Sequence, residues 1–178
     1  RSFDSGQYLD KCIICEKNLL DENTHYMIEK AIKKYPGYNT TDVIFEYAIC
    51  LECAEEMRKT MSDESQQRIT AYFDEHTDLM NRWLDYSKED NFNADDWLDD
   101  CLIKGSNRND LEQYQIYAQC VGSQMVYSFF PFMISEEAIE DMQELLSKKT
   151  RDEMDGFIDQ HFGLPPEIRK LIRDPILV

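Results

Sequence analysis

Apolar and polar positions along the chain change their spacing several times, and the first regular pattern is typical of a β-hairpin. Val43–Ile49 is β-branched and aromatic, and it follows His25–Tyr35 after the turn dipeptide Pro36-Gly37. This order predicts two antiparallel strands. A helix over residues 27–35 stays open as an alternative, because four apolar residues there share one helical face: Ile28, Ala31, Ile32 and Tyr35.

Helical patterns follow the hairpin. Leu51–Lys59 contains strong helix formers, with acidic residues first and basic residues last, as the helix dipole prefers. Ser62 then opens an amphipathic stretch of roughly twenty residues. Its apolar stripe is expected to face the core: Ile69, Tyr72, Phe73, His76, Met80, Trp83 and Leu84. We expect His76 to be a packed, hydrogen-bonded side chain, and we predict a shorter helix from Ala94 to Lys104.

The rest of the chain predicts a second hairpin and further helices. Tyr114–Val121 and Gln124–Phe130 carry aromatic and apolar residues at alternate positions on either side of Gly122-Ser123. A helix through residues 110–121 also suits the spacing. Three more helical segments are predicted, one capped by Ser135, one from Thr150 to Gly163, and a short one from Pro165 to Ile172.

The net charge of the chain restricts the possible partners more than its overall composition does. Of 178 residues 42% are hydrophobic, which is enough for a core, but 36 Asp and Glu against 19 Lys and Arg give a net charge of −17. Residues 1–61 hold 8 basic and 11 acidic side chains, a net charge of −3, whereas residues 62–178 hold 11 and 25, a net charge of −14. An acidic surface repels nucleic acid and anionic lipid, so we expect neither as a partner of the second part.

The acidic residues are densest between positions 85 and 100, where seven carboxylates stand against Lys88 alone. The simplest interpretation is a solvated surface, and the sharper one is a docking surface for a basic partner. No apolar run approaches the roughly 18–20 residues that cross a bilayer, and the first residues lack a signal-peptide pattern. We therefore expect a cytoplasmic protein with no membrane partner.

Cysteine spacing is the strongest chemical signal in the chain. Four of the six cysteines form two C-x-x-C pairs, at 12/15 and 50/53, with 34 residues between the pairs. A C-x-x-C turn aims two sulfurs at one ion, and two such turns complete the tetrahedral shell of a structural Zn²⁺. Iron would suit the same thiolates, while a redox dithiol and disulfides are weaker alternatives. Cys101 and Cys120 are expected to be small buried side chains.

The order of cysteine turn, hairpin, and cysteine turn opening a helix resembles the treble-clef type of zinc-binding domain, over about residues 8–61. The resemblance implies that one zinc ion per chain is held by Cys12, Cys15, Cys50 and Cys53. Treble clefs serve ribosomal, ubiquitin-related, unfoldase-adaptor and nuclease proteins, so the resemblance does not specify an activity. A nuclease would need further histidines around a second metal, and the hairpin offers only His25.

These patterns predict an α+β protein in two parts. Residues 1–61 would form a treble-clef-like zinc module of hairpin plus helix, packed on a mainly α-helical acidic body, residues 62–178, that contains one further β-hairpin. The sequence has no Gly-rich phosphate loop, nucleophile elbow or H-E-x-x-H motif. We therefore expect a non-enzymatic, zinc-stabilised adaptor that docks a protein partner, basic in charge, through its acidic surface.

Two other functions stay open. A nucleic-acid-associated regulator would contact DNA or RNA through the zinc module, using Lys30, Lys33 and Lys34, since this part is only mildly acidic. An enzyme whose site is assembled from scattered Asp, Glu, His and Tyr residues would leave no contiguous motif.

Overall fold

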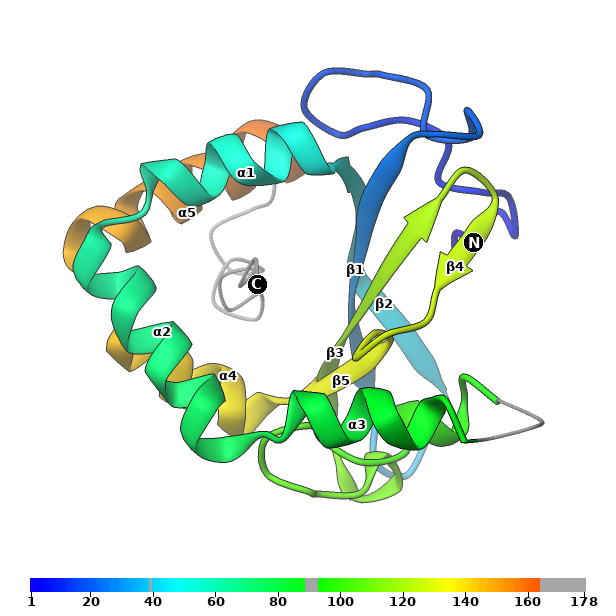
Figure 1. Ribbon diagram of the computed structural model, residues 1–178, viewed down its shortest axis with the longest axis vertical. Coiled ribbons are helices and arrows are strands. Elements are labelled where there is room, and N and C mark those ends of the chain that lie inside the picture. Colours follow the sequence, from blue (N-terminus) through cyan, green and yellow to red (C-terminus); the bar gives the residue numbers. More distant parts are fainter. Residues whose placement is uncertain (39, 89–92, 164–178) are drawn as a thin grey trace.

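The computed structural model describes residues 1–38, 40–88 and 93–163 (Figure 1). Strands β1 (His25–Lys34) and β2 (Thr41–Cys50) form the first predicted hairpin, which decides against the helical alternative for this segment. Helix α1 (Leu51–Thr60) begins at the residue after Cys50. Its first turn carries Glu52 and its last turn carries basic residues, which suits the helix dipole.

Three more strands extend this hairpin into a five-stranded antiparallel sheet: β3 (Gln113–Val121), β4 (Gln124–Val126) and β5 (Phe132–Ser135). The order is β2-β1-β3-β4, and β5 also pairs with β3. β1 is a central strand, hydrogen-bonded to β2 on one side and to β3 on the other. One sheet therefore contains strands from both sides of Met61.

Four helices lie on one side of this sheet (Figure 1): α1, α2 (Asp63–His76), α4 (Glu136–Leu145) and α5 (Lys148–Phe162). Ser135 caps α4 as predicted, by accepting a hydrogen bond from the Ala138 N–H. α5 ends at Gly163, whose φ of 53° is left-handed and suits glycine. The helical turn predicted for Pro165–Ile172 lies outside the described residues. Within the described residues, no helix is long and apolar enough to span a membrane.

The single long helix predicted after Ser62 is wrong. α2 ends at His76, and a separate helix, α3 (Leu79–Tyr86), starts where the Asp78 side chain accepts a hydrogen bond from the Asn81 N–H. Thr77 between them is extended, with a φ of −133°. A capping aspartate inside the apolar period was the local signal for this break.

The predicted buried stripe is confirmed only in its first half. Ile69 and Phe73 on α2 are buried, but Met80 and Trp83 on α3 expose 67% and 45% of their surface. His76 is exposed, but its ring packs against the Tyr72 ring at 4.3 Å between centroids and its Nδ1 lies 2.8 Å from the Tyr72 carbonyl oxygen, as predicted.

The helix predicted from Ala94 to Lys104 is also wrong. Only the short 3₁₀ helix η1 (Asp96–Leu98) forms there, and a second one, η2 (Arg108–Asp110), precedes β3. The Leu102 N–H donates to the Met133 carbonyl oxygen at 2.8 Å, so this backbone bonds to β5 instead of closing helical turns. Pairing with a distant strand has overridden local helix propensity.

Buried side chains form two hydrophobic clusters. The first joins α2, α4 and β5 and includes Phe73, Met133, Ile139 and Cys101. The second joins the N-terminal turn, β1, β2 and α5 and includes Leu19, Phe45, Phe157 and Cys120. Both lone cysteines are therefore buried, as predicted.

Candidate functional site

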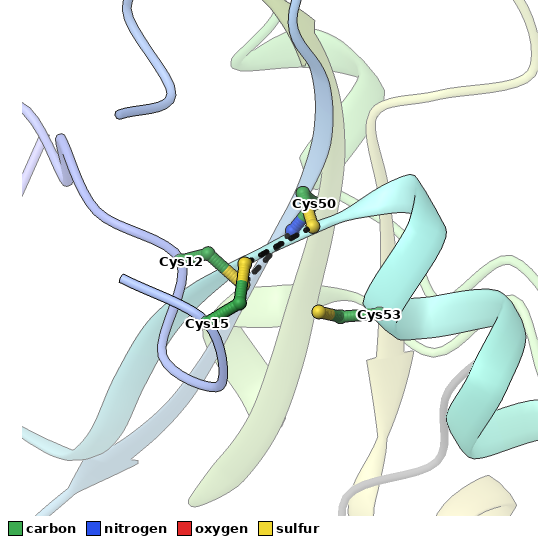
Figure 2. Close-up of side chains that lie close together, drawn as sticks. All are labelled: Cys12, Cys15, Cys50 and Cys53. Carbon is green, nitrogen blue, oxygen red and sulfur yellow. Dashed lines mark hydrogen bonds between the residues drawn. The ribbon is translucent and has the colours of Figure 1, made fainter. Parts of the chain in front are cut away.

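Two segments bring four thiol groups together at one end of the first hairpin (Figure 2). Cys12 and Cys15 lie in a turn that precedes β1, Cys50 ends β2, and Cys53 lies in the first turn of α1. Their sulfur atoms all lie within 4.8 Å of one another. In the part of the chain that the structure describes, this cluster is the group that could hold a metal ion, and all six cysteines are free thiols.

The sulfur separations suit one tetrahedral ion. A Zn–S bond of about 2.3 Å places the sulfurs of a tetrahedral site about 3.8 Å apart. Cys15 Sγ lies 3.8 Å from Cys50 Sγ. Cys12 and Cys50 are buried, Cys53 is half-buried and Cys15 is exposed, so the cluster lies just beneath the surface. Four thiolates fill the shell and leave no place for water or substrate, which is typical of a structural site.

Backbone hydrogen bonds shape the first cysteine turn. The Cys12 N–H donates to the Lys17 carbonyl oxygen at 3.0 Å, and the Glu16 N–H donates to the Cys12 carbonyl oxygen at 2.9 Å. Glu16 has a left-handed φ of 57°, which closes the turn. The Ile13 N–H donates to the Ala48 carbonyl oxygen at 2.9 Å. This last bond holds the turn against β2, beside the second cysteine pair.

The second pair follows from the junction of β2 and α1. Cys50 is the extended N-cap residue of α1, and Cys53 lies three positions later. Residues at this spacing face the same side of a helix. The positive end of the helix dipole favours thiolates there.

Hydrogen bonding and burial act in opposite directions on these thiols. Burial favours the neutral thiol of Cys12, but backbone N–H groups of Cys15, Cys50 and Ile14 outweigh it and lower the pKa of Cys12 to about 7. Burial raises the pKa of Cys50 to about 11, and burial together with the neighbouring thiols also raises the pKa of Cys53. Without a cation, therefore, these sulfurs do not all ionise, and metal binding would release protons.

An exposed ion pair joins the two halves of the cluster. Lys17 Nζ lies 3.1 Å from Glu52 Oε1, linking the first turn to the first turn of α1. The backbone N–H of Glu52 and the Lys17 ammonium lower the pKa of Glu52 to about 2. Exposed ion pairs contribute little to the free energy of unfolding, so we expect this pair to add little to the stability of the cluster.

A second feature lies on the acidic part of the chain, where four carboxylates surround a hollow of about 460 Å³ that we name the acidic hollow: Asp78, Asp85, Asp96 and Asp100. Arg82 also lines this hollow, 4.1 Å over the Trp97 ring, and its guanidinium donates to the carbonyl oxygens of Trp97, Phe129 and Pro131. Among the described residues, the ion pairs include none between Arg82 and a carboxylate. The buried guanidinium is thus engaged by backbone.

Two carboxylates of the acidic hollow accept hydrogen bonds from neighbouring amide side chains. Asp78 accepts a hydrogen bond from the Asn81 side chain at 2.6 Å, and Asp100 accepts one from Asn107 at 3.0 Å. These amide donors are uncharged, whereas Asp85 pairs with Lys88 at 3.0 Å. The adjoining helix α3 also exposes Met80, Trp83 and Leu84. At about 100° per residue these apolar side chains lie on the side of α3 that faces away from the acidic hollow.

The three lysines proposed for nucleic-acid contact are spread along β1. Lys30 pairs with Glu46 at 2.8 Å, and Lys34 donates to the Arg108 carbonyl oxygen. Lys33 lies 5.8 Å over the Tyr35 ring. All three are half-buried.

The sequence patterns did not single out Glu29, yet this residue is 2% exposed in the middle of the sheet. Its two direct neighbours across the strands are Tyr47 on β2 and Tyr117 on β3. The available signal was its alternation with Met27 and Ala31 on a strand whose residues are almost all apolar or basic. Glu29 lies on the face of the sheet that α1 covers, between strands on both sides, and its carboxyl group is therefore buried.

Comparisons of the chain with protein-family models, with curated proteins and with solved structures find no match. The geometry of the described residues therefore carries the functional argument that follows.

Proposed function

We propose that this chain is a zinc-stabilised adaptor, in which a treble-clef-type zinc domain supports a surface that docks a basic segment of a protein partner. The cluster of four thiol groups within 4.8 Å of one another, formed by a turn and a helix start, carries the zinc assignment. Cys12, Cys15, Cys50 and Cys53 would be the four ligands. A closed thiolate shell supports a structural role and offers no position for catalysis.

Elemental analysis tests the metal. We expect one zinc per purified chain, and we expect Cys15→Ser to lower that content well below one. Cys120→Ala is the matched control, because Cys120 is buried outside the cluster and its loss should leave the zinc in place. Iron in place of zinc would overturn the choice of metal, and freely titratable thiols with no metal would overturn the site.

The docking proposal rests on charge complementarity. Among the described residues, Lys88 beside Asp85 is the basic partner of the carboxylates of the acidic hollow, and the other side of α3 exposes apolar side chains. A partner segment that carries Lys or Arg together with an apolar side chain would neutralise the carboxylates and cover the apolar side chains of α3. Trp83 is the expected anchor residue, since aromatic residues dominate binding energy at the centre of interfaces.

Charge-neutral variants test the docking surface. The triple variant Asp78→Asn, Asp96→Asn and Asp100→Asn keeps the side-chain shapes and the hydrogen-bond acceptors while removing three charges. A control with the same charge change elsewhere is Glu144→Gln, Glu153→Gln and Asp155→Asn on α4 and α5.

We expect a partner captured by the wild type and reconstituted from purified protein to bind the triple variant at least about tenfold more weakly, with the control unchanged. Equal loss of affinity in both triple variants would mean that binding depends on net charge alone, and it would contradict docking at the acidic hollow. Binding of nucleic acid that is lost with Lys30→Ala and Lys34→Ala would favour the regulator instead.

A further inference from the structure

A cavity of about 220 Å³ lies where β1, β2 and β3 meet α1, and its lining includes a buried carboxyl group. Its floor is the row Tyr47, Glu29 and Tyr117, which are direct cross-strand neighbours. Its wall includes Ala54, and its rim carries the exposed residues Glu55 and Arg58. The cavity thus reaches solvent at α1 and has a buried carboxyl group at its inner end.

Glu29 is held in place by aromatic hydroxyls. The Tyr47 hydroxyl donates to Glu29 Oε2 at 2.6 Å. The Tyr117 hydroxyl donates its one proton to Gln115 Oε1 at 2.5 Å, and its oxygen lies 3.4 Å from Glu29 Oε1. These contacts fix the carboxyl group on the cavity floor. Each of its oxygens keeps a second lone pair for another donor.

The ionised form of Glu29 has no counter-ion in this arrangement. A buried carboxylate is unfavourable unless a positive group compensates it, so a bound cation would favour ionisation of Glu29. Among the described residues, no ion pair includes Glu29. The nearest basic lining residue, Arg58, is exposed and directs a guanidinium nitrogen to Gln66 Oε1 at 3.4 Å.

We propose that this cavity binds a compact organic ammonium ion from solution, with Glu29 as its counter-ion. The ammonium group would donate to Glu29, and the rings of Tyr47 and Tyr117 would supply cation–π attraction beside it. The apolar part of the ligand would lie against Ala54. At about 30 Å³ per water, the cavity takes roughly seven water-sized groups, so the ligand is small.

The proposal goes beyond docking and zinc binding, since none of its residues belongs to the thiol cluster or the acidic hollow. Calorimetric titration of the zinc-loaded full chain with cyclohexylammonium tests it, with cyclohexanol as a neutral probe of the same shape. We expect saturable binding of the ammonium probe at one site and at least about tenfold weaker binding of cyclohexanol, which corresponds to loss of one charged interaction.

Two variants locate the binding. Glu29→Gln keeps an acceptor for Tyr47 and removes the charge. It should lower the affinity for the ammonium probe at least about tenfold. Glu56→Gln, at an exposed position of α1 outside the cavity lining, is the matched control and should change affinity less than threefold. Ala54→Phe, which fills the cavity and leaves Glu29 intact, should abolish binding even if Glu29→Gln folds poorly. Equal affinity for both probes, unchanged affinity in Ala54→Phe, or no binding at millimolar probe would each overturn the proposal.

Discussion

At position 29 a carboxyl group lies between two tyrosines and is almost completely shielded from water. Burial raises the pKa of Glu29 to about 8, against the lowering effect of the hydroxyls of Tyr47 and Tyr117. The other charged groups that line the cavity are Glu55 and Arg58 on α1. In the folded chain without a bound cation, Glu29 therefore holds its proton at pH values where the unfolded chain has released it.

The sign of the resulting pH dependence follows from proton counting. Between pH values near 4.5 and 8 the folded state binds more protons at Glu29 than the unfolded state does, so this residue makes stability fall as pH rises. Glu29→Gln removes the effect. We expect its stability relative to wild type to rise by at least about 1 kcal/mol between pH 5.5 and pH 8.

Urea unfolding at several pH values measures this difference, and other titrating groups cancel because both proteins contain them. Glu55→Gln, at an exposed position, should run parallel to wild type. A stability difference between wild type and Glu29→Gln that does not change with pH would contradict the prediction.

Among the elements, the starts of α2 and α5 depend on each other. Ser62 caps α2 and Ser147 caps α5, and their hydroxyl oxygens lie 2.9 Å apart. Ser65 accepts a hydrogen bond from the Ser147 N–H at 2.8 Å, and Thr150 accepts one from the Ser62 N–H at 3.0 Å. Ser65 and Thr150 are fully buried. Each helix start thus supplies the acceptor that the other needs.

Ser65→Ala should destabilise the protein by about 1–3 kcal/mol, because the Ser147 N–H would lose its acceptor in a buried place. Thr70→Ala on the same helix is exposed and should change stability by no more than about 0.5 kcal/mol. Thermal and urea unfolding of both variants measure the effect. Equal stability of the two variants would mean that the reciprocal caps contribute nothing.

The whole molecule shares one sheet, so the thiol cluster should affect more than the segment that carries it. β1 follows the first cysteine turn in the chain and pairs with β3 along its length. A metal that holds the turn against β2 would therefore stabilise β1, and β1 would stabilise β3. Loss of about 3 kcal/mol on metal removal would lower the melting temperature by roughly 6–12 °C in a chain of this size.

Chelation under reducing conditions, followed by amide hydrogen exchange, tests this coupling. We expect protection to fall in β1, β2 and β3, and we expect Cys15→Ser to give the same pattern without chelator. Cys120→Ala should keep the wild-type pattern. Loss of protection confined to residues 1–24 would show that the sheet does not depend on the cluster.

Elements with a strong local pattern were predictable, and those that depend on distant partners were not. Val43–Ile49 and the start of α4 at Ser135 carry β-branched residues or a cap within a few positions, and both formed as predicted. The segment from Ala94 to Lys104 has a helical period, but its backbone bonds to β5. The sequence contains no local sign of that pairing.

The sequence by itself determined the composition of the thiol cluster, because the C-x-x-C spacing defines which sulfurs one turn can aim together. It also determined the first hairpin and the acidity of the second part. Only the tertiary structure decided that β1 lies at the centre of one sheet, that Glu29 is consequently buried between two tyrosines, and that Trp83 is exposed. These outcomes depend on which strands and helices meet across long stretches of chain, and local periodicity does not carry that information.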